Sequence, residues 1–220
     1  MTKLLARNLI SLMPKPDYYH EKQISSSGFK LIAGIDEVGR GTLAGPVVAG
    51  VIIIDINDNV EQTLIKLGVN DSKALTAKKR TDLYKQLIDI STDYSTGWAS
   101  PKEIDKIGIN PAIELSIIRA IKNLKIEPDH LLIDALKLDN LKYKQTSIIK
   151  GDTKSLLIAS ASIVAKVERD KYMENLSTKY DKYEFKNNKG YGTKKHIAAI
   201  KAYGKSEYHR KSFKIKGLDY

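Results

Sequence analysis

Two apolar segments separated by a glycine-rich loop set the strongest limit on how this chain can fold. The first covers residues 29–36, and the second, "VVAGVIIID", covers Val47 to Asp55. Short apolar segments of this kind, rich in β-branched residues, are typical of buried strands. The first segment closes on two adjacent acids, Asp36 and Glu37, so two charges stand where a predicted buried strand ends.

The rest of the chain alternates helical and strand patterns. Helix starts are predicted at Thr76, at the capping box "SPKE" of Ser100 to Glu103, and at Asn110 with its following proline. Strands are predicted over "YSTGWA", "HLLID" and "QTSIIKGD". Helices are predicted from about residue 153 past Met173 and over residues 194–203. We therefore predict a mixed α/β sheet flanked by helices, with a small C-terminal helical cap.

The composition limits which classes of binding partner and which kinds of chemical site this chain can have. Lys and Arg number 37 against 26 Asp and Glu, and the formal net charge of +11 favours a polyanion such as nucleic acid. The chain has no cysteine, which excludes disulfides, thiolate zinc sites and thiol nucleophiles and is compatible with a cytoplasmic protein. No apolar run approaches the ~20 residues of a membrane span, so no membrane partner is expected.

The chain is expected to form one domain with a short N-terminal extension. The extension covers residues 1–28, and the domain with its helical cap covers residues 29–220. The extension starts with an apolar stretch, but Arg7 and Asn8 interrupt it and no small-residue cleavage site follows. We expect the extension to pack loosely on the domain or to be mobile, and we expect the protein to be a monomer.

Four carboxylates stand where predicted strands end or helices begin: Asp36, Glu37, Asp134 and Asp152. Ligand sites in open α/β sheets lie just beyond the ends of strands. Clustered carboxylates need a cation or added protons, and oxygen-only ligands suit Mg²⁺ or Mn²⁺, as in two-metal phosphoryl transfer. The residues alone also allow a structural interpretation, in which Asp152 is a helix N-cap and Asp134 a turn residue.

Two glycine-containing loops carry basic or aromatic residues. Gly39, Arg40 and Gly41 allow main-chain groups to approach a ligand closely, or they form a tight turn that requires positive φ. Tyr191 lies in "KGYGTKKH", between glycines and among lysines. Its ring is suited either to stacking on a sugar or base or to packing on its own helix.

Six motifs along the chain resemble those of bacterial ribonuclease HII. In the order of that family they are "GIDEVGRGTLAGPVVAG", "NDSKALT", "LLIDALKL", "KGDTKSLLIASASIVAKVERDKYM", "KGYGTKKH" and "HRKSF". They span about residues 30–213. The resemblance implies an RNase H-like catalytic domain that cuts RNA in RNA–DNA hybrids and single ribonucleotides in duplex DNA. Cleavage on the 5′ side of the ribonucleotide, leaving 3′-OH and 5′-phosphate ends, and roles in replication and repair are implied as well.

The same resemblance implies roles for individual residues. The family's catalytic, metal-binding carboxylates correspond to Asp36, Glu37, Asp134 and Asp152. The element by which the family recognises the ribose corresponds to Gly39, Arg40 and Gly41, and its junction-sensing tyrosine corresponds to Tyr191. The metals would be Mn²⁺ or Mg²⁺ in a two-metal site. Thr42 stands where the family often has proline, and no tail typical of binding to a DNA sliding clamp is evident. The alternatives are another two-metal nuclease of this superfold and a non-enzymatic basic module that binds nucleic acid.

Overall fold

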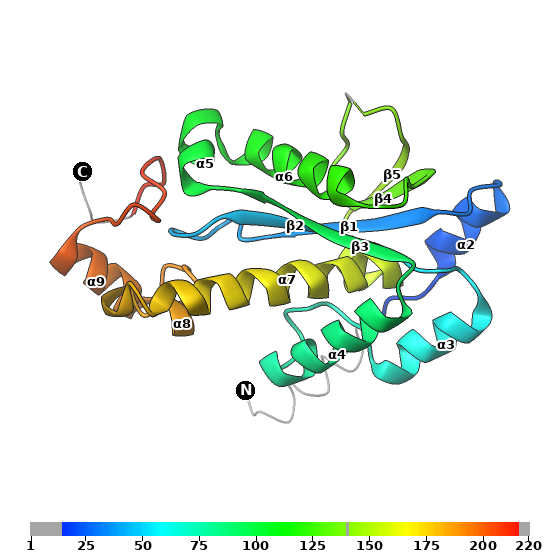
Figure 1. The fold of residues 1–220 in the computed structure, drawn as a ribbon, viewed down its shortest axis with the longest axis horizontal. Coiled ribbons are helices and arrows are strands. Elements are labelled where there is room, and N and C mark those ends of the chain that lie inside the picture. Colours follow the sequence, from blue (N-terminus) through cyan, green and yellow to red (C-terminus); the bar gives the residue numbers. More distant parts are fainter. Residues whose placement is uncertain (1–14, 140, 216–220) are drawn as a thin grey trace, which may run out of the picture.

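A five-stranded mixed sheet forms the centre of the molecule (Figure 1). The computed structural model describes residues 15–139 and 141–215. The strand order is β3-β2-β1-β4-β5; β2 is antiparallel to β1 and β3, and β4 is parallel to β1 and β5. The strands are β1 Ile32–Val38, β2 Val47–Ile53, β3 Asp93–Ala99, β4 His130–Asp134 and β5 Lys144–Ile148. The mixed α/β sheet predicted from the sequence is confirmed.

Helices cover both faces of this sheet (Figure 1). One apolar cluster joins α5 and α6 to one face, and a second joins α2, α3, α4 and α7 to the other. Strand β1 is buried on both sides, because Ile32 belongs to the second cluster and Ile35 to the first. The helices are α2 Tyr19–Ser26, α3 Asp58–Leu67, α4 Ala77–Ile90, α5 Pro101–Ile107, α6 Ile109–Asn123, α7 Leu156–Ser177, α8 Phe185–Asn188 and α9 Lys194–Tyr203, with 3-10 turns η1 Gly151–Thr153 and η2 Asp181–Tyr183.

Two strand glycines allow the covering helices to approach the sheet closely. A Cβ at Gly34 in β1 would lie 2.4 Å from the backbone carbonyl carbon of Leu157 in α7. A Cβ at Gly97 in β3 would lie 2.0 Å from the carbonyl oxygen of Ser116 in α6. A side chain at either position would push the helix away from the sheet. The contact at Gly34 holds the first turns of α7 against the strand that ends in the acidic pair.

Residues 15–28, the described part of the predicted N-terminal extension, pack closely on the domain. Glu21 of α2 is fully buried, with 0% exposure. Asp17 forms a parallel β-bridge with Ser155 at the start of α7. This segment therefore differs from the loose packing or mobility that we expected. Residues 1–14 lie outside the described part of the chain, and the boundary at residue 29 stays a prediction.

The C-terminal cap packs on the second half of α7. An apolar cluster joins α7 to η2, α8 and α9 through Met173, Tyr183, Phe185 and Ile200. The 22-residue helix α7 runs without interruption from the sheet into the cap (Figure 1). The small helical cap is therefore confirmed, and it shares its main helix with the sheet. In the part of the chain that the structure describes, no helix combines the length and apolarity needed to cross a membrane.

Two predicted helix starts are confirmed. The side chain of Thr76 accepts a hydrogen bond from the amide of Lys79 and caps α4. Ser100 and Glu103 form a complete capping box at α5, with each side chain bonded to the other's backbone. These signals operate within four residues, so the tertiary structure has little influence on them.

Two other predicted helix starts are wrong. Helix α6 begins at Ile109 and has no side-chain cap; Asn110 instead accepts a hydrogen bond from the Arg40 guanidinium at 2.9 Å. The N-cap interpretation of Asp152 also fails, because Ser155 caps α7 and Asp152 lies one turn earlier, in η1. In both cases a polar side chain faces the end of the sheet, where the predicted site lies.

Candidate active site

The ends of neighbouring strands bring the four predicted acids together. Strands β1 and β4 are parallel and paired in register, so Asp36 and Asp134 stand at adjacent carboxyl ends. Glu37 follows on β1, and Asp152 lies in η1, which contacts β4. The charges of Glu37, Asp134 and Asp152 each raise the pKa of at least one other member of the group. We refer to Asp36, Glu37, Asp134 and Asp152 as the acid cluster.

Asp36 is the member of the acid cluster whose pKa is raised most strongly. It is 5% exposed, and its Oδ1 accepts the amide hydrogen of Glu37 at 2.7 Å. Burial raises the pKa of the Asp36 carboxyl well above its ordinary value, and the charge of Glu37 raises it further. A hydrogen bond from Ser162 of α7 opposes this rise, while Asp134 and Asp152 add to it. The structure therefore disfavours the ionised form of Asp36.

Glu37 and Asp134 show the same effect. Burial and then the charge of Asp134 raise the pKa of Glu37, although Arg40 opposes the rise from 3.8 Å. Burial raises the pKa of Asp134 and Asp152 adds to the rise, although Asp134 Oδ1 accepts the Gly151 amide at 2.7 Å. The acid cluster thus contains more negative charge than the chain compensates.

Lys73 is a further cation of this site that sequence reasoning did not assign. It lies in the loop before α4, and its Nζ is 3.3 Å from Asp152 Oδ2. Burial lowers the pKa of Lys73, but the charges of Asp152, Asp71 and Asp36 outweigh burial, so the net direction is upward. The motif "NDSKALT" was the only available signal, because the two partners are 79 residues apart.

The acid cluster fits a hard divalent cation by its chemistry. Its donors are all carboxylate oxygens, and the raised pKa values of Asp36, Glu37 and Asp134 indicate a position where positive charge is stabilised. Within the described ranges, no three His, Asp or Glu side chains are grouped closely enough to hold an ion as they stand. Binding would therefore require the acid side chains to turn toward the ion.

The Gly39–Gly41 loop follows β1 directly. Gly39 has a φ of +93°, and a Cβ there would lie 2.4 Å from Nε of Arg169, so only glycine fits. Gly41 is exposed, and a Cβ added there would meet nothing within 4 Å. Arg40 is also exposed. The loop therefore presents two exposed residues next to the acid cluster.

Tyr191 presents its ring to solvent from a fixed backbone. The residue is 41% exposed, and Nζ of Lys166 lies 5.8 Å from the ring centroid. The Tyr191 carbonyl accepts a hydrogen bond from Nδ1 of His196 at 2.8 Å. His196 is held in turn by buried His209, with 3.0 Å between their Nε2 atoms. The exposed ring favours the stacking interpretation over packing on its own helix.

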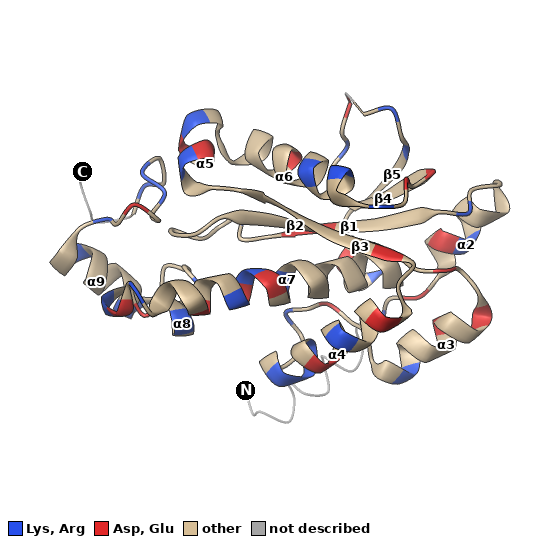
Figure 2. Cartoon of the chain, in the orientation of Figure 1, with Lys and Arg blue, Asp and Glu red and all other residues tan. Residues whose placement is uncertain are grey.

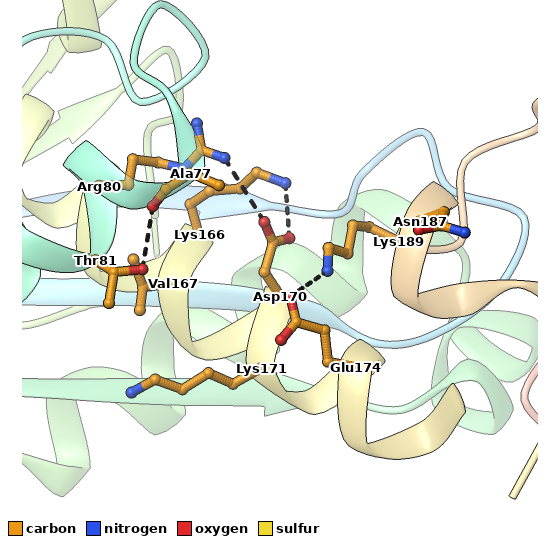
Figure 3. A pocket seen from close by; sticks show the side chains of 10 residues that line it. All are labelled: Ala77, Arg80, Thr81, Lys166, Val167, Asp170, Lys171, Glu174, Asn187 and Lys189. Carbon is orange, nitrogen blue, oxygen red and sulfur yellow. Dashed lines mark hydrogen bonds and ion pairs between the residues drawn. The ribbon is translucent and has the colours of Figure 1, made fainter. Parts of the chain in front are cut away.

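A basic pocket lies between α4, α7 and the α8 region, close to Lys166 (Figure 3). Its volume is about 330 Å³. Arg80 and Lys166 both point at Asp170, at 3.9 and 2.7 Å, and Lys189 pairs with Glu174 (Figure 3). Ala77, Thr81, Val167, Lys171 and Asn187 also line it. Helices α4 and α7 both carry basic residues (Figure 2), and Lys189 follows α8. Cations outnumber acids in the pocket, which suits an anionic ligand.

Most of the chain is similar to one group of proteins. The family model described as Ribonuclease HII matches residues 33–216. A ribonuclease HII of Caldicellulosiruptor bescii is 48% identical over 193 residues, which cover 88% of this chain and 91% of that protein.

Solved structures show the same similarity. The PCNA:RNase HII complex from Archaeoglobus fulgidus contains a chain that is 25% identical, with a TM-score of 0.71, over 86% of this chain and 98% of that one. Ribonuclease H2 from Pyrococcus horikoshii OT3 is 32% identical, with a TM-score of 0.69, over 83% and 93%. Bst-RNase HIII in complex with Mn²⁺, at 19% identity and a TM-score of 0.58 over 80% and 63%, shares the fold.

Proposed function

The chain belongs to the ribonuclease HII family and is an endonuclease of RNA–DNA hybrids, and we propose that it also cuts duplex DNA on the 5′ side of single ribonucleotides. The proposed products carry a 3′-OH and a 5′-phosphate. One observation carries the proposal: Asp36 and Glu37 of the acid cluster lie at the end of β1, and the Gly39–Gly41 loop with its exposed residues Arg40 and Gly41 follows them directly. Recognition of a sugar and cleavage of its phosphodiester can therefore occur at neighbouring positions.

The acid cluster is proposed to bind two divalent cations, Mn²⁺ or Mg²⁺. Carboxylate oxygens are the ligands that these ions prefer. When bound, the ions would supply the positive charge that activates water and stabilises the leaving oxygen. The chain's own contribution is to hold Asp36, Glu37, Asp134 and Asp152 at one sheet edge in a buried setting where their ionised forms need a counter-charge.

Lys73 and Arg40 are proposed to contact the scissile phosphate. Lys73 lies 3.3 Å from Asp152, and Arg40 lies 3.8 Å from Glu37. Their side chains are 73% and 55% exposed, so each can turn from its carboxylate toward a phosphate oxygen. Both cations would then orient the phosphate over the acid cluster.

The Gly39–Gly41 loop is proposed to recognise the ribose. The 2′-OH is the group that distinguishes RNA from DNA at a given position. Main-chain groups of the exposed residues Arg40 and Gly41 can hydrogen-bond a 2′-OH, and a deoxyribose would leave them without that partner. Recognition by hydrogen bonding of this kind can discriminate by a factor on the order of 10⁴.

Tyr191 is proposed to stack on the sugar at the junction between RNA and DNA, and the basic pocket is proposed to bind the nucleic-acid backbone. The exposed ring supports the first role. The excess of Lys and Arg around Asp170 supports the second. Lys166 links the two features, because it lines the pocket and lies near the Tyr191 ring.

Cleavage of a DNA duplex that carries one ribonucleotide, with labelled ends, tests the proposed function. We expect one cut on the 5′ side of the ribonucleotide with Mn²⁺ or Mg²⁺, and none when EDTA is added. An all-DNA duplex of the same sequence is the control, and a four-way junction tests the alternative nuclease. Cleavage of the junction but not of the ribonucleotide duplex would overturn the proposal.

A further inference from the structure

Two arginine side chains are completely buried between the sheet and the cap. Arg169 of α7 and Arg210, which follows α9, both have 0% exposure. Burial lowers the pKa of both guanidiniums, that of Arg210 to about 9. Arginine side chains stay protonated in proteins at neutral pH. Their hydrogen bonds to described residues go to carbonyl and hydroxyl oxygens. A buried charge persists when hydrogen bonds of this kind offset its desolvation.

Arg210 turns the carbonyls of the glycine loop inward. Its Nη2 donates to the carbonyl of Gly39 at 2.6 Å, and its Nη1 donates to the carbonyl of Arg40 at 2.8 Å. The C=O and N–H of a trans peptide point in opposite directions, and no described peptide bond is cis. The inward carbonyls therefore direct the amides of Arg40 and Gly41 outward, as recognition of a 2′-OH by main-chain donors would require.

Thr42 connects this loop to the second arginine. The residue is fully buried, with 0% exposure. Its hydroxyl donates to the Gly39 carbonyl at 3.0 Å and accepts from Nη2 of Arg169 at 2.9 Å. The hydroxyl thus fixes a position where the family often has proline, whose ring would restrict the backbone by a different means.

Arg169 also joins the glycine loop to the Tyr191 segment. Its Nε donates to the carbonyl of Pro46 and its Nη1 to the carbonyl of Lys189, both at 2.9 Å. The carbonyl of Gly190 accepts the amide of Leu43 at 2.8 Å. Through these contacts the two segments that would recognise the substrate form one hydrogen-bonded unit.

We propose that Thr42, Arg169 and Arg210 are positioning residues for substrate recognition. Thr42 and Arg210 set the outward direction of the loop amides, and Arg169 sets the loop relative to Tyr191. None of the three needs to touch the substrate. The inference rests on the proposed function, because it takes the glycine loop as the element that recognises the ribose.

The test measures discrimination between two DNA duplexes, one with a single ribonucleotide and one with a 2′-deoxy-2′-fluoro nucleotide at that position. Discrimination is the ratio of the two kcat/KM values. Thr42→Val removes the hydroxyl, and we expect the ratio to fall by about tenfold, as for loss of a hydrogen bond to a charged group. Thr42→Ser keeps the hydroxyl and should retain the ratio. Thr63→Val is the matched control, because its hydroxyl donates to an exposed helix carbonyl.

Arg169→Lys tests the link between the two segments. We expect it to lower both the ribose discrimination and the preference for a lone ribonucleotide over a continuous RNA–DNA hybrid, whereas Thr42→Val should lower only the first. Arg119→Lys, at a surface ion pair, is the control. Thermal unfolding shows whether each variant folds. If Arg169→Lys does not fold, Thr42→Val alone decides whether these residues position the glycine loop.

The outcomes separate this inference from the function on which it rests. A wild-type protein that cuts both duplexes equally would overturn ribose recognition itself. A wild-type protein that discriminates, together with a folded Thr42→Val variant that discriminates equally well, would leave the function standing and overturn the positioning role.

Discussion

The acid cluster and the glycine loop meet at the end of β1 and both involve buried charge, but the charge is compensated differently. Burial and like charges raise the pKa of Asp36 and of Glu37, so their ionised forms lack sufficient partners in the chain. Arg169 and Arg210 remain charged because inward carbonyls and one hydroxyl accept their hydrogen bonds. The proposed cations would therefore complete the acid cluster, whereas the chain's own groups complete the loop.

The largest expected effect is loss of cleavage in Asp36→Asn. The variant removes one charge from the acid cluster, and cleavage of the ribonucleotide duplex should fall by a factor on the order of 10³ or more. Binding of the hybrid should remain largely intact, because the loop and basic pocket are unchanged. Rates with Mg²⁺ and gel-shift affinities measure both effects. A wild-type cleavage rate would show that the acid cluster is not the metal site.

Glu21 extends the comparison to a buried acid outside both regions. Burial raises its pKa to about 7. Its Oε1 accepts hydrogen bonds from Ser155 Oγ at 2.6 Å and from the Leu157 amide at 3.0 Å, while Oε2 has no partner among the described residues. Because the folded pKa exceeds the unfolded value, its contribution to stability is fully present at low pH and is lost as the pH rises through about 7.

Glu21→Gln should therefore stabilise the protein at pH 8 and have little effect at pH 5. Glutamine keeps an oxygen acceptor but carries no charge, and the gain in the free energy of unfolding should be on the order of 3 kcal/mol. Chemical denaturation at the two pH values measures it. Glu61→Gln, at a partly exposed ion pair with Lys22, is the control. The same effect at both pH values would contradict a raised pKa for Glu21.

Tyr191→Ala should have a smaller effect, confined to recognition. Loss of stacking should lower the preference for a lone ribonucleotide over a continuous hybrid by about tenfold. Competition between the two substrates measures that preference. Tyr203→Ala removes a ring that is 58% exposed on α9 and provides the control. An unchanged preference in Tyr191→Ala would remove the stacking role.

The smallest expected effect concerns the basic pocket. Lys171→Gln should reduce the magnitude of the slope of log affinity against log salt by about 0.9, the amount expected for one phosphate contact. Lys142→Gln, in the β4–β5 connection, should leave the slope unchanged. Binding of Asp36→Asn to hybrid at several salt concentrations allows the measurement without cleavage. Equal slopes for both lysine variants would argue against a backbone contact in the pocket.

Local patterns in the sequence predicted the sheet strands and several helix ends, because the interactions concerned span only a few residues. The Ser100–Glu103 capping box is an example. Helix α2 was not predicted because its sequence "YHEKQISS" shows no apolar face. It is ordered by contacts with distant residues: Glu21 is buried against Ser155, 134 residues away.

The candidate site was predictable in part, because some of its residues are marked by local sequence patterns. Acids at the ends of strands indicated where Asp36 and Asp134 would meet, since parallel neighbours end at the same sheet edge. The ion pair of Lys73 with Asp152 and the hydrogen bonds of Arg210 to the glycine loop depend on tertiary packing across long stretches of chain. Single-sequence patterns carry no information about such pairs.

Binding of Asp36→Asn to the ribonucleotide duplex and to its 2′-fluoro counterpart tests most directly whether recognition and cleavage are separate. The account predicts that this variant, which cannot cut, still binds the ribonucleotide duplex about tenfold more tightly, because the glycine loop and its arginines are intact. Equal affinities for the two duplexes would contradict the account, since ribose recognition would then depend on the acid cluster.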